Sequence, residues 1–354
     1  QPFVLTRWLR ARKYDYNDTT KMVIEATACR EEARKADYYP DPYEALGVDP
    51  SVYISQYPQL YTGFSKDGCP VFYSKPGVLN IDGVECITTL AGILNYHWHV
   101  MQHDYCKRLL QFKKENPSFK RFECVSVLDL ANLTMGQLGS RTLDIIKKQA
   151  FIDSLCFPET MNKMVIVNAP RFFSATWSII KGFVDVRTAS KVELFSSLTA
   201  AGKKLREIID ENDLPSDYGG KAESTKVLLA KEACLHDEKM VSLKTEVMYV
   251  RSSQSFKFPL KEDEEADIFV HTRATDGATF KVVDGGTKAD LAPPQKVRHT
   301  GGVGDNVAPT KVHMTAAGRI GSGGVKREVK VKAESLRTRM SSEAFLVVVS
   351  VYKK

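Results

Sequence analysis

A short apolar strand followed by a nearly uncharged aromatic segment, both within residues 157–191, constrains the fold of this chain more than any other feature. Residues 164–167, Met-Val-Ile-Val, are apolar on both faces, as a strand inside a parallel sheet requires. Asn168-Ala169-Pro170 ends this strand, because proline lacks a ladder donor and disfavours helical geometry in its predecessor. The sequence therefore predicts a buried strand that leads directly into a new element.

The segment that follows, residues 172–184, predicts a helix that is apolar on more than one face, with Lys181 as its only charge. Such a helix must be buried or must cover something apolar. We interpret it as a mobile lid over an apolar pocket that is also lined by the strands at 125–128 and 164–167, with plain core packing as the alternative. The residues assigned to the lid and pocket lining are Phe172, Phe173, Trp177, Ile180 and Phe183.

Five pieces of sequence, in order, resemble the CRAL-TRIO lipid-transfer family, which includes secretory-pathway phosphatidylinositol transfer proteins. They are Tyr57-Pro58 with residues 67–71, the strand at 125–133, the lid region up to Lys191, residues 212–215, and residues 218–221. The resemblance implies an α/β CRAL-TRIO lipid-binding domain preceded by helices. It also implies a non-enzymatic, cytoplasmic protein that exchanges one lipid between membranes, such as those of the Golgi or endosomes, under a gate helix.

The domain organisation is predicted from changes in the hydrophobic pattern along the chain. A chain of 354 residues usually folds around two hydrophobic cores. Residues 3–14 predict the interior of a basic helix without a cap, so we expect a fragment whose earliest helices are missing. The predicted segments are a truncated N-terminal helical subdomain (1–45), the CRAL-TRIO lipid-binding domain (46–223), a linker (224–239) and a β-sandwich (240–354).

The last segment predicts an all-β sandwich, because short alternating apolar runs separated by turns replace the helical periodicity from about residue 240. Residues 250–253 followed by Phe256 and Phe258 resemble the opening of a GOLD domain, the sandwich that follows the CRAL-TRIO domain in supernatant protein factor. The run at 345–349, Phe-Leu-Val-Val-Val, replaces the aromatic-rich last hairpin of that family. A GOLD-like domain of this kind implies a protein partner for the β-sandwich.

The candidate headgroup site lies at residues 185–191, which predict a loop entering a helix. Thr188 can cap that helix and Lys191 lies one turn on, so backbone N–H groups and an ammonium can meet one phosphate. The resemblance implies that Thr188 and Lys191 contact the inositol phosphate together with Arg12 and Lys13 of the first helix. A solvated face is the alternative for Arg12 and Lys13.

Two departures from the family bear on which lipid is bound. A glutamate that holds the inositol ring in phosphatidylinositol-binding members aligns, without gaps, to Lys148, and the choline-associated hydroxyl pair falls on Cys124 and Ser126. If Lys148 faces the headgroup, a phosphoinositide with more phosphate than phosphatidylinositol is favoured; the alternative places Lys148 on a solvated helix face. Alternative cargoes are phosphatidylinositol and hydrophobic molecules such as a tocopherol, retinoid or squalene. Alternative functions are a lipid sensor that presents its cargo to a lipid kinase and a membrane-trafficking adaptor.

Other chemistries find little support in the sequence. The net charge of +7 is dispersed, which argues against nucleic acid and favours reversible contact with anionic membrane surfaces. Seven cysteines without a Cys-x-x-Cys pair indicate a reducing compartment rather than a disulfide framework. His97, His99, His103 and Cys106 have zinc-like spacing but no evident fourth ligand, and the glycine clusters at 301–304 and 318–324 predict flexible loops. We therefore predict no metal, no cofactor and no enzyme activity.

Overall fold

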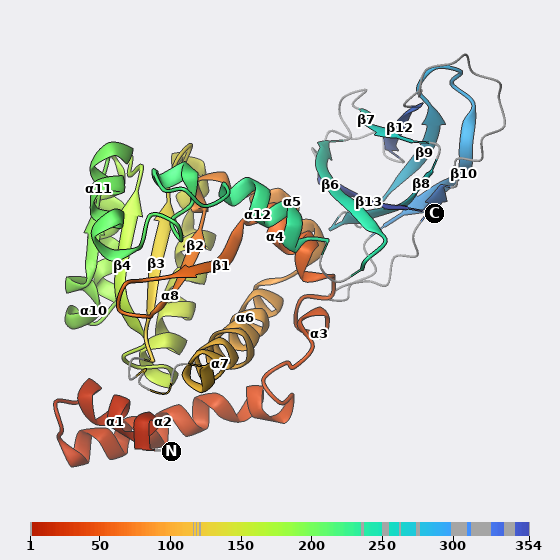
Figure 1. Ribbon diagram of the computed structural model, residues 1–354. Coiled ribbons are helices and arrows are strands. Elements are labelled where there is room, and N and C mark those ends of the chain that lie inside the picture. Colours follow the sequence, from red (N-terminus) through yellow and green to blue (C-terminus); the bar gives the residue numbers. More distant parts are fainter. Residues whose placement is uncertain are drawn as a thin grey trace. The chain divides into compact units, whose positions relative to one another are not determined.

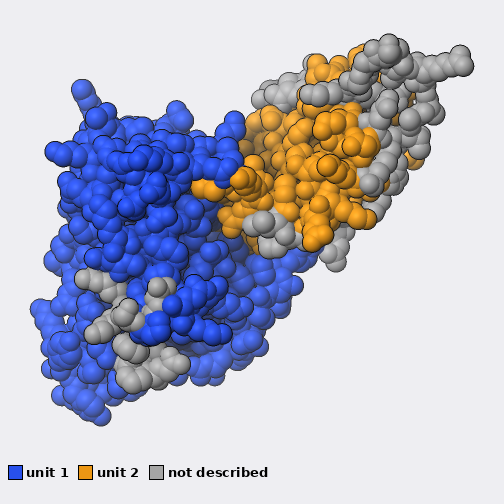
Figure 2. Space-filling view, viewed as in Figure 1, with its two compact units in different colours: residues 1–45, 57–79, 90–227 blue, residues 46–56, 80–89, 228–354 orange. Residues whose placement is uncertain are grey.

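The computed structural model describes residues 2–115, 117, 119, 122–234, 237–249, 255–261, 263–273, 277–298, 310–312, 327–335 and 344–353. The chain forms two compact units (Figure 2). The first contains residues 1–45, 57–79 and 90–227, and the second contains residues 46–56, 80–89 and 228–354. Two short early segments thus belong to the second unit, whereas the domain bounds read from the sequence stay a prediction.

The first unit is built around one five-stranded sheet with the order β1-β2-β3-β4-β5 (Figure 1). β1 (Gln59–Phe64) is antiparallel to β2 (Pro70–Ser74), and β3 (Cys124–Asp129), β4 (Met161–Val167) and β5 (Val192–Leu194) continue the sheet in parallel. The last three residues of β4 are buried. The predicted buried strand and the α/β class of this domain are therefore confirmed.

Helices flank this sheet and precede it. They are α1 (Pro2–Ala11), α2 (Tyr16–Lys35), α3 (Pro42–Leu46), η1 (Pro76–Val78), α6 (Leu90–His99), η2 (Val100–Tyr105), α7 (Cys106–Glu115), η3 (Met135–Leu138), α8 (Ser140–Cys156), α9 (Phe173–Ile180), η4 (Lys181–Phe183), α10 (Val186–Ser190), α11 (Leu198–Ile208) and η5 (Ser216–Tyr218). The helix α12 (Thr225–Glu232) begins in the first unit and continues into the second. One core cluster joins α1 and α2 to α6 and α8 through Trp8, Met22, Trp98 and Ile152. No helix among the described residues combines the length and apolarity needed to cross a membrane.

The second unit contains two four-stranded antiparallel sheets, ordered β10-β9-β12-β7 and β11-β8-β13-β6. Their inner faces share one core, in which the rings of Phe280 and Phe345 meet with centroids 5.3 Å apart. The predicted all-β sandwich is confirmed, although residues 250–253 and both glycine clusters lie outside the described residues. The strands are β6 (Met240–Tyr249), β7 (Ser255–Leu260), β8 (Glu264–Thr272), β9 (Ala278–Asp284), β10 (Asp290–Val297), β11 (Thr310–Val312), β12 (Arg327–Ser335) and β13 (Ala344–Lys353).

β13 is buried on both faces, which explains its uninterrupted apolar sequence. Val347 and Val349 lie in the core between the sheets, whereas Leu346 and Val348 point the opposite way and are still only 0% and 1% exposed. Helices α4 (Pro50–Gln56) and α5 (Ile81–Ile87) pack on that opposite face of the sheet. The two short early segments of the second unit therefore complete its structure.

Hydrogen bonds tie both helices to the strands they cover. The Gln56 side-chain amide donates to the Thr245 hydroxyl on β6 at 2.9 Å. The Arg273 guanidinium, just after β8, donates to the Glu85 carbonyl at 2.8 Å. These polar contacts fix where α4 and α5 lie, while the apolar contacts with β13 supply the burial.

Candidate functional site

Residues 185–191 form α10, but the helix is capped differently from the prediction. Asp185 is the N-cap residue, and its carboxylate accepts a hydrogen bond from the Arg187 backbone N–H at 2.8 Å. Thr188 lies inside the helix, and Lys191 follows its last residue as the C-cap. The predicted cap is therefore wrong, because Asp185 rather than Thr188 caps the helix and Lys191 lies at the opposite, negative end of the helix dipole. The headgroup role of Thr188 and Lys191 stays a prediction.

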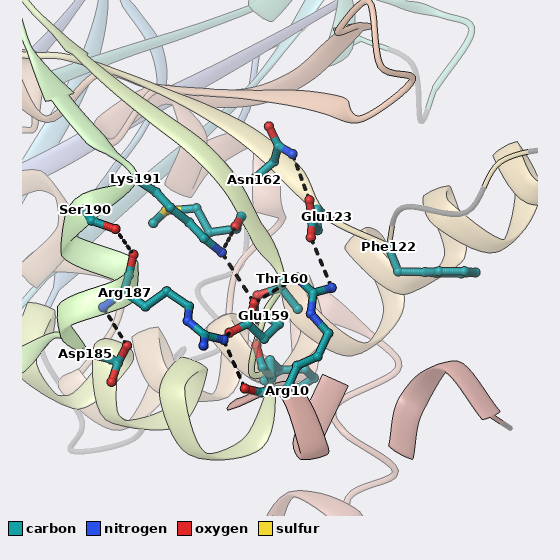
Figure 3. A network of polar contacts seen from close by, with 12 residues as sticks. Arg10, Phe122, Glu123, Glu159, Thr160, Asn162, Asp185, Arg187, Ser190 and Lys191 are labelled. Carbon is teal, nitrogen blue, oxygen red and sulfur yellow. Dashed lines mark hydrogen bonds and ion pairs between the residues drawn. The ribbon is translucent and has the colours of Figure 1, made fainter. Parts of the chain in front are cut away.

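Lys191 instead joins two arginines around one buried carboxylate (Figure 3). The Glu159 side chain, in the turn before β4, is only 7% exposed. Its oxygens lie 3.0 Å from Arg187 Nη1, 3.3 Å from Arg10 Nη2 and 3.6 Å from Lys191 Nζ. Arg10 of α1, Arg187 of α10 and Lys191 just after α10 thus surround the Glu159 carboxylate.

A second carboxylate extends this cationic network, which we define as Arg10, Glu123, Glu159, Arg187 and Lys191. Glu123 Oε1 lies 3.7 Å from Arg10 Nη1, and its Oε2 accepts from the Asn162 amide at 2.8 Å. The Asp185 carboxylate, which accepts from the Arg187 backbone N–H, lies beside these three cations and two carboxylates, so the charges of the site balance (Figure 3). A bound phosphate would have to take the place of a carboxylate at one or more of the cations.

Sequence reasoning identified Lys191 in this network and missed the other four members. The Glu159 backbone has φ +57°, a left-handed conformation that is uncommon outside glycine and asparagine. A non-glycine residue held there by three ion pairs marks a site whose surroundings fix its geometry. No local pattern signals this, because the Arg10 partner lies 149 positions away in the sequence.

The other predicted headgroup residues lie outside the cationic network. The Arg12 guanidinium donates to the Ala11 carbonyl at 3.3 Å, and Lys13 is exposed. Lys148, 45% exposed, pairs with Asp144 one turn earlier on α8 at 2.9 Å. The Lys148 ammonium thus has the surroundings of a solvated helix face.

The two β3 residues at the positions of the choline-associated hydroxyl pair differ from each other in exposure. Cys124 is buried and Ser126 is half-buried. Burial raises the pKa of the Cys124 thiol to about 12, so this group is a neutral thiol at physiological pH. It cannot act there as an anionic or strongly hydrogen-bonding partner for a headgroup.

The predicted lid residues gather in one apolar cluster on the sheet. Phe173, Trp177 and Ile180 of α9 are 5%, 8% and 8% exposed and pack with Leu130, Leu133 and Ile166. Phe172 and Phe183 are half-buried, and the Phe183 ring lies 5.7 Å from the Lys147 ammonium. On the opposite face of the helix, Ile179 is 52% exposed. Within the described residues, no side-chain hydrogen bond connects α9 to the sheet, since the Ser178 hydroxyl bonds back to the Ser174 carbonyl.

The two ends of α9 are held differently. Before the helix, the Asn168 side-chain amide donates to buried Asp129 at 2.7 Å, and the same carboxylate accepts from the Tyr218 hydroxyl at 3.1 Å. After the helix, Gly182 has open space around it, because an added Cβ would meet no atom within 4 Å. A glycine that packing does not require leaves the backbone free to change conformation at that end.

The cationic network and the apolar cluster meet on neighbouring residues. The Lys191 ammonium donates to the Met161 carbonyl at 2.7 Å, while the Lys191 carbonyl accepts from the Met164 N–H at 3.1 Å. Met164 and Val192 pack against the apolar cluster. Cationic and apolar side chains therefore lie side by side, an arrangement that suits a molecule with an anionic head and an apolar body.

The histidines with zinc-like spacing each have a separate partner. His97 pairs with Asp153 at 2.7 Å, His99 Nδ1 contacts the Tyr39 carbonyl at 2.7 Å and His103 contacts the Asp37 carbonyl at 3.0 Å. In the part of the chain that is described, no three His, Cys, Asp or Glu side chains group as metal ligands would.

Comparisons with known proteins identify relatives of this chain. A sequence profile of the CRAL/TRIO domain matches residues 54–220. The phosphatidylinositol/phosphatidylcholine transfer protein SFH12 of Arabidopsis thaliana is 29% identical over 219 residues, which are 61% of this chain and 39% of that protein. The SEC14 cytosolic factor of Candida glabrata is 30% identical over 226 residues, 62% of this chain and 70% of that protein. The crystal structure of Sfh5 is 19% identical in sequence. The match covers 62% of this chain and 74% of the Sfh5 chain, with a TM-score of 0.48. The chain thus spans well under two thirds of the Arabidopsis relative.

Proposed function

The chain belongs to the CRAL/TRIO domain family, and from this premise we propose that it binds a single lipid beneath α9 and exchanges it between membranes. The observation that carries the proposal is the junction of the cationic network with the apolar cluster at Lys191 and Met164. The names of the relatives support the same function, since they describe transfer of phosphatidylinositol and phosphatidylcholine and a cytosolic factor. We place the protein in the cytoplasm, reversibly bound to membranes.

In this mechanism α9 is the lid, because its attachment to the sheet is apolar. Exposing Phe173, Trp177 and Ile180 to water would cost about 5–9 kcal/mol in total, at roughly 1.5–3 kcal/mol for each side chain. The lid therefore stays closed in solution. At a membrane, acyl chains replace water around these side chains and remove most of that cost. Because no side-chain hydrogen bond of the described residues ties α9 to the sheet, opening breaks apolar contacts, and Gly182 allows the backbone to change at that end.

We propose that the headgroup phosphate binds the cationic network near Lys191, with Thr188 close by on α10. Arg10 and Arg187 are 42% and 45% exposed and have forked donors that suit phosphate, so phosphates on an inositol ring would pair with them in exchange for Glu159. A phosphoinositide is therefore the proposed cargo, with phosphatidylinositol next and a neutral hydrophobic molecule least favoured.

Replacing Lys191 with alanine is expected to lower loading of inositol lipids by about 10- to 150-fold, because a hydrogen bond to a charged group contributes about 1.5–3 kcal/mol. Mass spectrometry of copurifying lipid, and transfer of labelled phosphatidylinositol between vesicles, measure the effect. Lys148→Ala is the matched control, and we expect it to load like wild type because its ammonium is paired with Asp144. Equal inositol-lipid loading by folded Lys191→Ala would rule out this headgroup site.

Placing aspartate at Ile179 is expected to slow lipid exchange several-fold without lowering the melting temperature, because this side chain is 52% exposed and lies on the lid. A carboxylate there must approach the bilayer when the lid opens, which is unfavourable. Ile24→Asp, on α2 at 65% exposure, is the matched control and should exchange like wild type. Phe173 is less informative, since aspartate at 5% exposure would disrupt the closed lid itself. Normal exchange by Ile179→Asp would mean that this face of α9 does not meet the membrane.

A sensor that presents its lipid to a kinase would use the same site. It would stimulate lipid phosphorylation without net transfer between vesicles, whereas an adaptor would bind its partner with an empty site. Transfer and kinase assays on one preparation therefore separate the three functions.

A further inference from the structure

The outward face of the sheet β10-β9-β12-β7 carries a concentration of lysines. Phe258, Val329 and Val331 fill the core side of β7 and β12, so the alternate positions point outward. Cross-strand register and the turn after β9 bring the other outward lysines to the same face. We define the lysine face as Lys257, Lys281, Lys288, Lys296, Lys330 and Lys332.

The lysines are placed directly against one another. Lys330 lies opposite Lys257 in the register of β12 and β7, and Lys332 lies opposite Lys281 in that of β12 and β9. The neighbouring Lys330 ammonium lowers the pKa of Lys288. Like charges directly opposite in a sheet are destabilising, so this arrangement lowers the stability of the unit that carries it.

Few carboxylates offset this charge. Glu328 lies 3.1 Å from the Lys330 ammonium and 4.0 Å from that of Lys257, and Asp290 stands at the other edge on β10. Glu334, opposite Thr279 in the register of β12 and β9, takes a third acidic position on the outward face. Six lysines and three carboxylates leave three excess positive charges. An ordinary solvated face would intersperse the two signs.

We propose that the lysine face docks the protein on bilayers that contain anionic phospholipid, which deepens the lipid-exchange function proposed above. On this four-stranded face, about 15 Å across with strands about 4.8 Å apart, Lys257, Lys288 and Lys296 are exposed and can meet a plane of phosphates together. The Lys330 side chain is 14% exposed and pairs with Glu328, so it contributes less directly. Each basic residue beside an anionic leaflet raises partitioning about fivefold.

The composition of the face favours a bilayer over a nucleic acid. Its cations are lysines, which act as point charges, rather than arginines with their bidentate geometry for phosphate. The described outward positions also hold no aromatic side chain on which a base could stack. Phosphates in a planar array are therefore the better complement.

Vesicle binding of the full chain tests the proposal. Wild type should bind vesicles in which about a third of the phosphatidylcholine is replaced by phosphatidylserine, and should leave them when salt rises from about 0.1 M to about 0.5 M. The triple variant Lys257→Gln, Lys330→Gln, Lys332→Gln should partition about 100-fold less. Its melting temperature should equal or exceed that of wild type, because opposed like charges are removed.

A control variant with the same change in net charge isolates the location of the lysines. Lys21→Gln, Lys35→Gln, Lys221→Gln removes three exposed lysines from other surfaces and should bind anionic vesicles nearly as wild type does. Equal loss in both triple variants would overturn the proposal, since net charge alone would explain binding. Binding of duplex DNA or RNA that the first triple variant abolishes, with no vesicle binding by wild type, would overturn it in favour of a nucleic acid.

Lipid loading separates this proposal from the function it rests on. The lysine-face variant should copurify with the same lipid, in the same amount, as wild type. A wild type that carries no lipid but docks through the lysine face would defeat lipid exchange and leave docking standing. A wild type that loads lipid while the variant docks normally would defeat docking alone.

Discussion

Aspartate at Val348 is expected to unfold the second unit, although this side chain lies outside the core between the two sheets. Val348 is 1% exposed because α5 packs on the opposite face of β13. A carboxylate at this position would be buried without a partner, which we expect to cost about 4–5 kcal/mol or more. A loss of that size approaches the whole stability of a typical domain. Thermal unfolding followed by circular dichroism, together with limited proteolysis, measures the outcome.

Thr279→Asp provides the matched control, because Thr279 occupies an outward, half-buried position on β9 in the other sheet. This variant should melt within a few degrees of wild type. If Val348→Asp were equally harmless, that face of β13 would be open to solvent, and α5 would not be part of the second unit.

The apolar run at 345–349 shows which structural features can be predicted from the sequence and which cannot. A strand that is apolar at successive positions must be covered on both faces, so the burial of β13 could be inferred from these residues alone. The covering helix could not, because Cys86 on α5 is 258 positions away from the Ala344 carbonyl that its thiol contacts. For residues 164–167 the cover could be predicted as well. A short strand that is apolar at successive positions is typical of a parallel sheet, and such a sheet has helices on both faces.

The error at α10 had a local cause. Thr188 was predicted as the cap from the sequence, whereas Asp185 caps the helix in the structure, and aspartate is the better cap residue because its carboxylate accepts more strongly and favours the positive end of the helix. With Thr188 as the cap, the predicted helix began three residues too late. Lys191 was therefore placed near the N-terminus of the helix, whereas it lies at the C-terminus. Lys191 was singled out from the sequence, but it pairs with Glu159 in the turn before β4, which Arg10 of α1 also contacts, and no periodicity connects these residues.

Replacing Glu159 with alanine is expected to destabilise the first unit by about 2–3 kcal/mol. Removing one partner of a buried ion pair usually costs about 3–5 kcal/mol, and we reduce this because Arg10 and Arg187 are 42% and 45% exposed and partly screened by water. For a unit of this size the melting temperature should fall by roughly 5–10 °C. Added salt should recover part of the loss, because it screens the repulsion among the three cations left behind.

The left-handed backbone of Glu159 allows the carboxylate to be separated from the turn that carries it. Alanine keeps the strain at φ +57° and removes the ion pairs, whereas glycine removes the ion pairs and also relieves the strain. Glu159→Gly should therefore be more stable than Glu159→Ala by about 1 kcal/mol. Glu193→Ala supplies the surface comparison, since Glu193 also faces two lysines, at 4.0 and 3.4 Å, but is 39% exposed and should cost under about 1 kcal/mol. Equal losses at Glu159 and Glu193 would mean that the cationic network is an ordinary surface ion cluster, and the headgroup site would lose its structural basis.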